Sequence, residues 1–496
     1  MKHKLLSSLL VGSLLSGCTM IPEYSRPDYS AAQNWQQVPG YEQVSGRALA
    51  TQMDWTSFYS SPEFQMVIAA ALKNNRDLKT SALNIDEARA LYRIERSDIF
   101  PNVNFNGDGT IVKSSDESSV TGQGAKSKLY EANIGIAAYE IDLFGRIRSE
   151  NEVAINAYLA TEEAHAVVRT ALIAETANAY FQLLADQKLL QLTQKTLDAQ
   201  QSAYNILSQS LDKGFSTVQD VARAATAVET ARVNLHQYSR LVAQDKHALF
   251  LLMGIAQDDT VLPKTTLDDV VIKENLDPGI PSEVLLFRPD IRQAEYELIA
   301  RNANIGAARA AFFPSITLTG TYGFASQDMG ELFSSNASGA WSFLPQINIP
   351  IFQGGRNEAN LELAKIRKEK AVINYERTIQ VAFKEVSDEL AARETLEQQL
   401  KSQRKLVDAA QTVYDISNAR YTSGIDSFLS VLDAQRELYT YQQQEIQIER
   451  QRVSNLVNLY KVLGGGAYLN RTDEVSKDRS DKQDTISKDV TILMNQ

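Results

Sequence analysis

The residue whose type and position most clearly point to covalent chemistry is Cys18, the single cysteine of this 496-residue sequence. It follows a basic start, an apolar run over Leu5–Leu15 and the small residues Ser16 and Gly17, a pattern typical of a secretory signal peptide. The pattern resembles a bacterial lipobox, in which cleavage leaves the cysteine at the new N-terminus and its thiol is acylated. An unused cysteine inside an ordinary signal peptide is the alternative. We therefore predict a lipoprotein signal peptide over residues 1–17 and lipidation at Cys18.

Other residue types that carry chemistry are too sparse or too scattered to build a site. Four histidines and one cysteine indicate no metal centre, and no nucleophile stands in a pattern with a base. The formal net charge is −11, from 50 Lys+Arg against 61 Asp+Glu, and no block of basic residues is present. These features argue against a nucleic-acid partner. We expect no enzyme activity, no cofactor and no bound metal.

The sequence contains an internal duplication with an offset close to 210 residues, so we expect its helices and strands to occur in two copies. The recurring glycines are the pairs Gly145 and Gly355, Gly214 and Gly424, and Gly254 and Gly464. Between these glycines, Arg146–Lys213 and Arg356–Ser423 are both 68 residues long and contain neither glycine nor proline. Each run can therefore be helical throughout, which at 1.5 Å per residue makes a helix of about 100 Å.

Each half also contains two segments in which apolar and polar residues alternate, joined by polar loops at 113–128 and 325–340. In the second half the apolar positions include Ile316, Leu318, Tyr322, Phe324, Trp341, Phe343 and Ile347. In the first half they are Tyr130, Ala132, Ile134, Ile136 and Ala138, with Tyr139 on the other face and a weaker strand over Val103–Ile111. Alternation over about 9–11 residues with one polar face is typical of outer-membrane strands. A soluble β-domain on a helical bundle is the alternative.

Four such strands cannot close a barrel, and hydrocarbon does not tolerate an open sheet edge. We therefore expect identical chains to pool their strands. Two chains would give eight strands with a filled interior, whereas three would give twelve, the smallest shared barrel here with room for an aqueous lumen.

Short motifs of distinctive composition lie at the ends of these elements. They include Arg288-Pro289-Asp290-Ile291, Ala303-Asn304-Ile305-Gly306, Phe313-Pro314-Ser315, Ile141-Asp142-Leu143-Phe144-Gly145-Arg146 and Val431-Leu432-Asp433-Ala434-Gln435. Over about residues 18–466 they resemble the TolC-like outer membrane factor family. The resemblance is strongest to its OprM-like lipoprotein branch, which serves resistance-nodulation-division tripartite efflux pumps.

The resemblance implies an α+β membrane protein built as a homotrimer. Four strands per chain would form a 12-stranded β-barrel, continuous with a long periplasmic α-helical barrel and a mixed equatorial belt. The implied function is a passive outer-membrane exit duct for drugs. A periplasmic membrane fusion (adaptor) protein and an inner-membrane resistance-nodulation-division pump would open its periplasmic tip. A structural envelope lipoprotein without a lumen and a type I protein secretion channel are the alternatives.

By the same resemblance, the chain would be lipid-anchored and barrel-inserted in the outer membrane, in contact with its lipid, and would extend into the periplasm. Thr19 follows the lipidated cysteine in place of an aspartate, which favours the outer membrane by the sorting rules of lipoproteins. Gly214 and Gly424 match the turns at the periplasmic tip. Each could equally be a glycine that ends a helix in the left-handed conformation, and the two roles are compatible.

The resemblance also assigns an aperture and a closing contact at this tip. Leu429 and Asp433, four residues apart on one helical face, match the residues that narrow the family's channel. Three copies of Asp433 would form an acidic ring that attracts cations, although a surface pair with Arg436 is the alternative. Asp220 and Tyr421 match a pair that links neighbouring tip coils in the closed state.

The sequence departs from TolC itself at the tip. Asp426 and Ser430 stand where TolC has an arginine and an aspartate, so its closing network is not expected to transfer as a whole. The domain organisation that we predict is a signal peptide at 1–17, an extended segment at 18–61, a first repeat at 62–254 with a hairpin at 101–143, a connector at 255–281, a second repeat at 282–466 with a hairpin at 314–352, and a disordered tail at 467–496.

Overall fold

The computed structural model describes residues 19–27, 48–50, 53–113, 115, 126–258, 262, 265–269, 272, 276–277, 287–334, 338–465 and 467. The predicted signal peptide, Cys18 and all but Ala467 of the predicted tail lie outside these residues, as do parts of the predicted connector. The chain divides into two compact units. Unit 1 comprises residues 1–28, 84–162 and 293–376, and unit 2 comprises 29–83, 163–292 and 377–496. Each unit therefore draws on both halves of the duplication.

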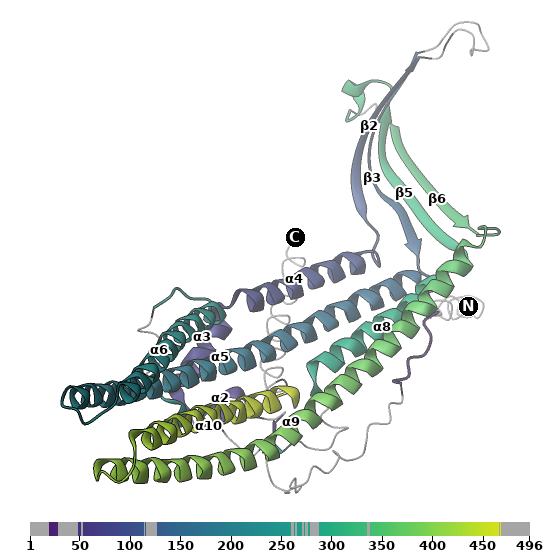
Figure 1. The fold of residues 1–496 in the computed structure, drawn as a ribbon. Helices are drawn as coiled ribbons and strands as arrows, with labels where there is room; N and C mark the ends of the chain where they lie inside the picture. Colours follow the sequence, from purple (N-terminus) through teal and green to yellow (C-terminus); the bar gives the residue numbers. More distant parts are fainter. Residues whose placement is uncertain are drawn as a thin grey trace. The chain divides into compact units, whose positions relative to one another are not determined.

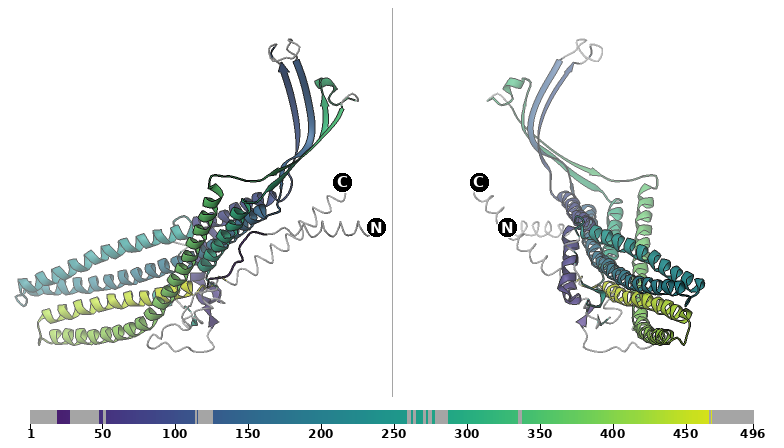
Figure 2. Two further views of the ribbon diagram at one scale, coloured as in Figure 1. Left: turned by 90° about the vertical axis from the view of Figure 1, so that its right-hand side faces the viewer. Right: turned by 60° about the vertical axis from the view of Figure 1, so that its left-hand side comes forward.

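The sheet of unit 1 contains four antiparallel strands in the order β2-β3-β5-β6 (Figure 1). Their bounds are β2 Val103–Lys113, β3 Lys126–Ile141, β5 Ser315–Ser326 and β6 Ser338–Asn348. The two sequence-predicted hairpins are thus present, and they join where β3 pairs with β5. The four strands bend together into one curved sheet (Figure 2). Strands β2 and β6 form its two edges, and no other described strand pairs with either edge.

Registered pairing places apolar residues on one face of the sheet, which we call the apolar face. It carries Val103, Phe105, Ile111, Ile134, Ile136, Ile316, Leu318, Tyr322, Phe324, Trp341, Phe343 and Ile347. Most of these side chains are exposed, with Trp341 at 76% and Phe105 at 70%, whereas Ile136, Ile316 and Leu318 are partly buried. On the polar face, the Thr321 and Ser342 hydroxyls lie 2.6 Å apart. The sheet therefore separates an apolar from a polar environment.

The predicted alternation fails near the foot of β3. Two residues separate Ile136 and Tyr139, whereas only one separates their partners on β5, so β3 contains a bulge. Ala138, at φ 50°, donates its N–H to Thr319 Oγ1 at 3.1 Å. The extra residue places Tyr139 on the apolar face, which corrects the predicted faces of Ala138 and Tyr139. Because the partner strand fixes this register, the alternation of one strand alone could not reveal the bulge.

Beside the sheet, unit 1 contains helical segments that are held by specific contacts. The helices here are α4 (Arg76–Ser97), α8 (Pro289–Ala310) and the N-terminal parts of α5 (Arg146–Asp212) and α9 (Arg356–Thr422). The extended segment before residue 28 lies along α8, where Arg26 forms a two-pronged ion pair with Glu295 at 2.7 and 2.8 Å. A Cβ on Gly306 would lie only 2.6 Å from Ile21 and from Ser149, so this packing requires glycine. A short 3₁₀ helix, η5 (Met329–Glu331), follows β5.

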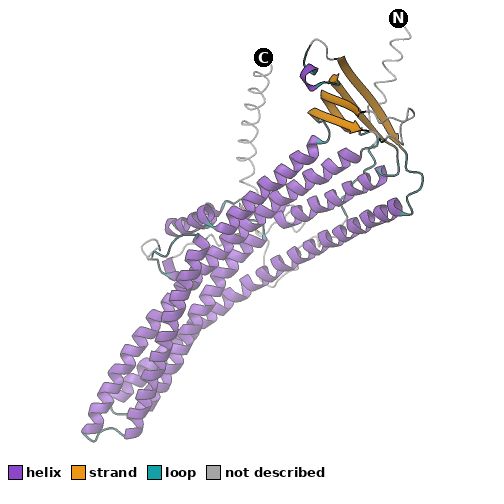
Figure 3. Ribbon diagram, turned by 90° about the horizontal axis from the view of Figure 1, so that it is seen from above, coloured by secondary structure: helices purple, strands orange, loops and turns teal. Residues whose placement is uncertain are grey.

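The two glycine- and proline-free runs are helical almost from end to end, as the sequence predicted. Helices α5 and α9 are both 67 residues long, and they are followed by α6 (Val218–Met253) and α10 (Phe428–Val462). The duplicated glycines have matching left-handed conformations, for example φ 76° at Gly145 and 80° at Gly355. In unit 2, the C-terminal parts of α5 and α9 run beside α6 and α10 towards two short turns (Figure 3). No helix among the described residues is long and apolar enough to cross a membrane.

The hydrophobic core of unit 2 is rich in aromatic residues, which come from the first helices of the chain and from the long helices α5 and α10. It involves α2 (Trp55–Phe58), α3 (Pro62–Asn74), the 3₁₀ helix η4 (Leu267–Asp269) and the parallel pair β1 (Ala48–Leu49) and β4 (Leu276–Asp277). Phe58 stacks on Tyr460 with ring centroids 4.2 Å apart, and Phe64 stacks on Tyr180 at 4.8 Å. This core anchors the middle of α5 and the end of α10 that lies away from the turns.

The Arg288-Pro289-Asp290 motif begins α8 as its sequence suggested. The buried Arg288 guanidinium donates to the Val462 carbonyl at the end of α10 at 2.8 Å and pairs with Asp290 and Glu385 at 2.7 Å. Because every prong of the guanidinium has a partner, its role here is structural.

Candidate site at the helix turns

Two turns in unit 2 join α5 to α6 and α9 to α10, and they have the same backbone geometry. Gly214 and Gly424 have φ of 78° and 71°. Their N–H groups each donate to a carbonyl three residues back, and the next N–H donates five residues back, in both turns at 2.8–2.9 Å. A Cβ on either glycine would meet no atom within 4 Å. Glycine is therefore needed at both positions for its left-handed conformation rather than for space.

After these glycines the two turns differ in how the following helix begins. Thr217 and Asp220 form a capping box at the start of α6, with Asp220 Oδ2 accepting from the Thr217 hydroxyl at 2.6 Å. At the start of α10, Ser427 makes no side-chain cap. Instead, the Arg420 guanidinium donates two hydrogen bonds, of 2.6 and 3.1 Å, to the Asp426 carboxylate. These hydrogen bonds lower the pKa of the Asp426 carboxyl. Asp426, which stands where TolC has an arginine, thus forms an ion pair within its own turn.

An apolar cluster, which we call the tip cluster, holds the four helix ends together. Its buried members are Leu207 of α5, Ala224 of α6, and Phe428 and Val431 of α10. Tyr421 of α9 packs against Phe428 with ring centroids 5.2 Å apart. The two helical hairpins are therefore coupled immediately beside the turns.

Leu429 and Asp433 lie close to the tip cluster but remain open to solvent. Leu429 is 38% exposed, whereas its neighbour Phe428 is buried. The Asp433 side chain is 50% exposed and pairs with Arg436 at 3.2 Å. The predicted alternative for Asp433, a pair on its own helix surface, is present in the single chain. Such an exposed pair holds the carboxylate only weakly, so it leaves Asp433 available to another partner.

The structure does not bring Asp220 and Tyr421 together within one chain. The Asp220 carboxylate is used in its own capping box, and the Tyr421 ring belongs to the tip cluster. Among the described residues of a single chain, no hydrogen bond joins the two side chains.

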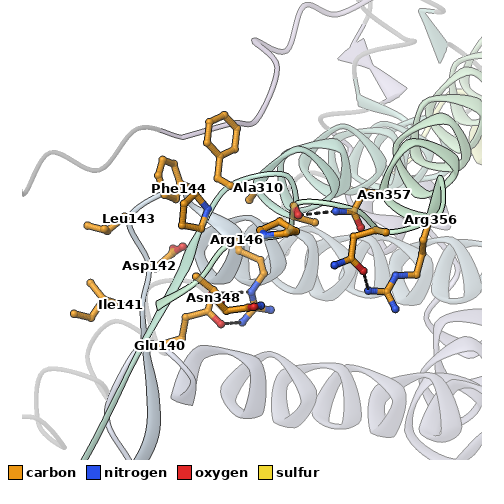
Figure 4. A pocket seen from close by; sticks show the side chains of 16 residues that line it. Glu140, Ile141, Asp142, Leu143, Phe144, Arg146, Ala310, Asn348, Arg356 and Asn357 are labelled. Carbon is orange, nitrogen blue, oxygen red and sulfur yellow. Dashed lines mark hydrogen bonds and ion pairs between the residues drawn. The ribbon is translucent and has the colours of Figure 1, made fainter. Parts of the chain in front are cut away.

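A second group of motif residues surrounds a cavity of about 250 Å³ within unit 1, where strands meet helices (Figure 4). Arg146 spans the strand-to-helix bend, donating to both oxygens of Glu140 at 2.8–2.9 Å and pairing with Glu150 at 2.8 Å. The hydrogen bonds to Glu140 raise the pKa of the Arg146 guanidinium far above its usual range. Phe144 stacks on Phe313 with ring centroids 4.7 Å apart. Because its charges are already satisfied by each other, this junction is a structural brace.

The Arg146 clamp could have been found in the sequence, where glutamates lie on either side of Gly145-Arg146. A second feature had no sequence signal. Asp186 of α5 and Asp245 of α6 interact in the interior of unit 2, where burial and then the Asp186 carboxyl raise the pKa of Asp245 to about 7. Gln182 donates to Asp186 at 2.8 Å. Within the part of the chain that is described, no three His, Cys, Asp or Glu side chains gather to hold a metal ion.

Comparison with known proteins adds to this geometry. The sequence model of the family described as outer membrane efflux protein matches residues 67–255 and 280–465. The chain is similar to the antibiotic efflux pump outer membrane protein ArpC of Pseudomonas putida. It is equally similar to the toluene efflux pump outer membrane protein TtgC of the same species. Each relative is 46% identical over 469 residues, which cover 94% of this chain and 96% of the relative.

A solved structure has the same fold. The open state of the Neisseria gonorrhoeae MtrE outer membrane channel is 36% identical and has a TM-score of 0.82, covering 91% of this chain and 99% of that chain.

Proposed function

This chain belongs to the outer membrane efflux protein family, and we propose that it is the outer-membrane exit duct of a tripartite pump that expels drugs and apolar solvents. The observation that carries the proposal is its near-full-length similarity to relatives named for antibiotic and for toluene efflux. Transported molecules would cross the duct unchanged.

We propose that three chains assemble around one axis. Each would contribute β2, β3, β5 and β6 to a 12-stranded barrel whose exposed apolar face contacts lipid. The long helices would form a periplasmic α-helical barrel below it, with the core around Phe58 and Tyr460 in an equatorial belt. The assembly would be held in the outer membrane both by the barrel and by acylated Cys18.

The tip turns would form the gate. Leu429 and Asp433, exposed beside the tip cluster, would face the axis, and three copies of each would narrow the opening. Asp220 and Tyr421 would link neighbouring coils in the closed state. A periplasmic adaptor protein and an inner-membrane resistance-nodulation-division pump would bind the assembly and shift the equilibrium from closed to open coils.

Deletion of the gene with plasmid complementation tests the proposed function. The deletion strain should become sensitive to toluene and to structurally unrelated antibiotics, and the wild-type gene should restore resistance. Unchanged sensitivity together with loss of a secreted polypeptide would favour a protein secretion channel. Unchanged sensitivity with a weakened envelope would favour a structural lipoprotein.

The lipid anchor needs a separate test because Cys18 lies outside the described residues. Labelled palmitate should be incorporated into the wild-type protein and not into Cys18→Ser. The Cys18→Ser variant should still reach the outer membrane, since insertion of the proposed barrel does not require the lipid anchor. Label in the Cys18→Ser protein would contradict lipidation at this residue.

A further inference from the structure

Each edge strand of the sheet needs a second strand to pair with, and the internal duplication predicts which strand of a neighbouring copy that is. Among the described residues, the outer edges of β2 and β6 meet no further strand, while the apolar side chains of these strands stay exposed. By sequence position β2 is the counterpart of β5, and β6 is the counterpart of β3. The contact of β6 in one copy with β2 in the next is therefore the counterpart of the β3–β5 contact, which the structure describes in full.

The strands can be aligned residue by residue. The shared Phe-Pro motif, at 100–101 and 313–314, matches β2 to β5 with an offset of 213, so that Val103 corresponds to Ile316. The Gly145 and Gly355 pair matches the foot of β3 to that of β6 with an offset of 210. Above the bulge the offset is one residue greater, because β6 has no residue that corresponds to the one inserted in β3.

The pairing inside the two hairpins checks this alignment independently. Val103 lies opposite Ile136 in the first hairpin, and their counterparts Ile316 and Ile347 lie opposite each other in the second. The same holds for two further pairs of opposed residues: Phe105 with Ile134 corresponds to Leu318 with Pro345, and Gly109 with Tyr130 corresponds to Tyr322 with Trp341. These pairs belong to one continuous ladder in each hairpin, so they test the sum of the two offsets, and that sum agrees with the offsets taken from the Phe-Pro and glycine motifs.

Transferring the β3–β5 register to the edges, we infer that β6 of one copy pairs with β2 of the next in a single antiparallel register. The opposed residues are Trp341 with Lys113, Phe343 with Ile111, Gln346 with Asp108, and Ile347 with Gly107. This inference rests on the proposed function, which supplies the association of identical chains. It adds the register of the seam between them.

The register keeps both faces of the sheet continuous across the seam. Trp341, Phe343 and Ile347 are 76%, 60% and 62% exposed in the single chain, and they would remain beside the apolar residues of β2. Gln346 would meet Asp108 on the polar face. A slip of one residue would place apolar side chains on the polar face, so one-residue slips are strongly disfavoured. The seam would also lack the bulge of β3, so it would be straighter than the pairing inside the chain.

Cysteine cross-linking in the outer membrane tests the register. In Gln346→Cys/Asp108→Cys, oxidation should convert the bulk of the chain to covalent dimer and trimer on a non-reducing gel, with no larger species. The same two residues within one chain are separated by β3 and β5, about 14 Å across three strand spacings, so they cannot form an internal disulfide. Each single variant, which keeps the natural Cys18, serves as a control for other disulfides.

Pairs shifted by two residues on the same face provide the contrast. Gln346→Cys/Asn106→Cys and Gln346→Cys/Thr110→Cys place Cβ atoms about 7–8 Å apart, beyond disulfide reach, and should cross-link far less. Leu344→Cys/Thr110→Cys repeats the test in the inferred register in case one variant fails to fold. Stronger cross-linking of a shifted pair, in protein that is still trimeric by native mass spectrometry, would overturn the register and leave the proposed function intact. Protein that never associates would overturn both.

Discussion

At the scale of single residues, the proposed gate would depend on side chains that have few partners within a single chain. Asp433 has only an exposed pair with Arg436, and Leu429 lies beside the buried tip cluster without joining it. Exposed ion pairs contribute about 0–1 kcal/mol, so stability within the chain does not account for an acid at this position. A ring of three such carboxylates at an aperture would act on passing ions instead.

Leu429→Ala combined with Asp433→Asn should therefore raise the resting conductance of the purified assembly in planar bilayers several-fold and reduce its cation selectivity. Glu229→Gln is the matched control, because Glu229 pairs with Arg232 at the same i,i+3 spacing on α6. This control should conduct like the wild-type protein. Equal conductance in all three proteins would contradict the assignment of the aperture.

Asp220 has two roles to separate, since its carboxylate caps α6 and is proposed to bind Tyr421 of a neighbouring coil. Thr217→Ala removes the cap, at a cost of about 1 kcal/mol, but keeps the carboxylate. Asp220→Ala with Tyr421→Phe removes both roles. If the pair is a lock, only the double variant should admit vancomycin and sensitise the cells. Equal sensitisation by Thr217→Ala would reduce Asp220 to a capping residue.

At the scale of elements, the two turn glycines are required for their backbone conformation alone. Because an added Cβ would meet nothing at Gly214 or Gly424, substitution by alanine should cost only the strain of the left-handed conformation, about 1–2 kcal/mol at each site. Thermal unfolding of the detergent-solubilised protein should show this loss. Gly330→Ala, at a glycine of η5 without positive φ where an added Cβ would make only an ordinary contact with Asp328, is the control and should be neutral. A neutral Gly424→Ala would show that the turn does not require a left-handed residue.

The Asp186–Asp245 contact should make the packing of α5 on α6 depend on pH. The folded-state pKa of Asp245 is about 7, above its usual value, so the folded state binds more protons between about pH 4 and 7. The free energy of unfolding therefore falls as the pH rises through this range and levels off above it. Tyr238 faces the pair and stays neutral throughout, since burial raises its pKa as well.

Asp245→Asn should be more stable than the wild-type protein at pH 8, and this advantage should be clearly smaller at pH 5, as measured by thermal unfolding at both values. Asp408→Asn, at an exposed position on α9, controls for the loss of one negative charge and should show no such difference between pH values. A difference at pH 5 as large as that at pH 8 would mean that the pair does not titrate in this range.

Elements were easier to predict from the sequence than contacts. The lengths of α5 and α9 follow from the absence of glycine and proline, which is a local property, and the hairpins follow from alternation. The bulge near Ala138 and the meeting of Asp186 with Asp245 depend on a second segment of chain. No local pattern records which segments will meet, so these features required the structure.

At the scale of the whole molecule, the proposed function depends on association. The curved sheet has two open edges, which hydrocarbon does not tolerate, and an apolar face, which is unfavourable in water. The gate residues at the turns would form a ring only if several copies surround an axis. The sheet and the turns therefore both require several chains around a common axis.

The most direct test is native mass spectrometry of the protein extracted from the outer membrane in detergent. We predict a single assembly with the mass of three lipidated chains. A monomer that remains soluble after the detergent is removed, with no membrane-embedded sheet, would contradict the proposed duct.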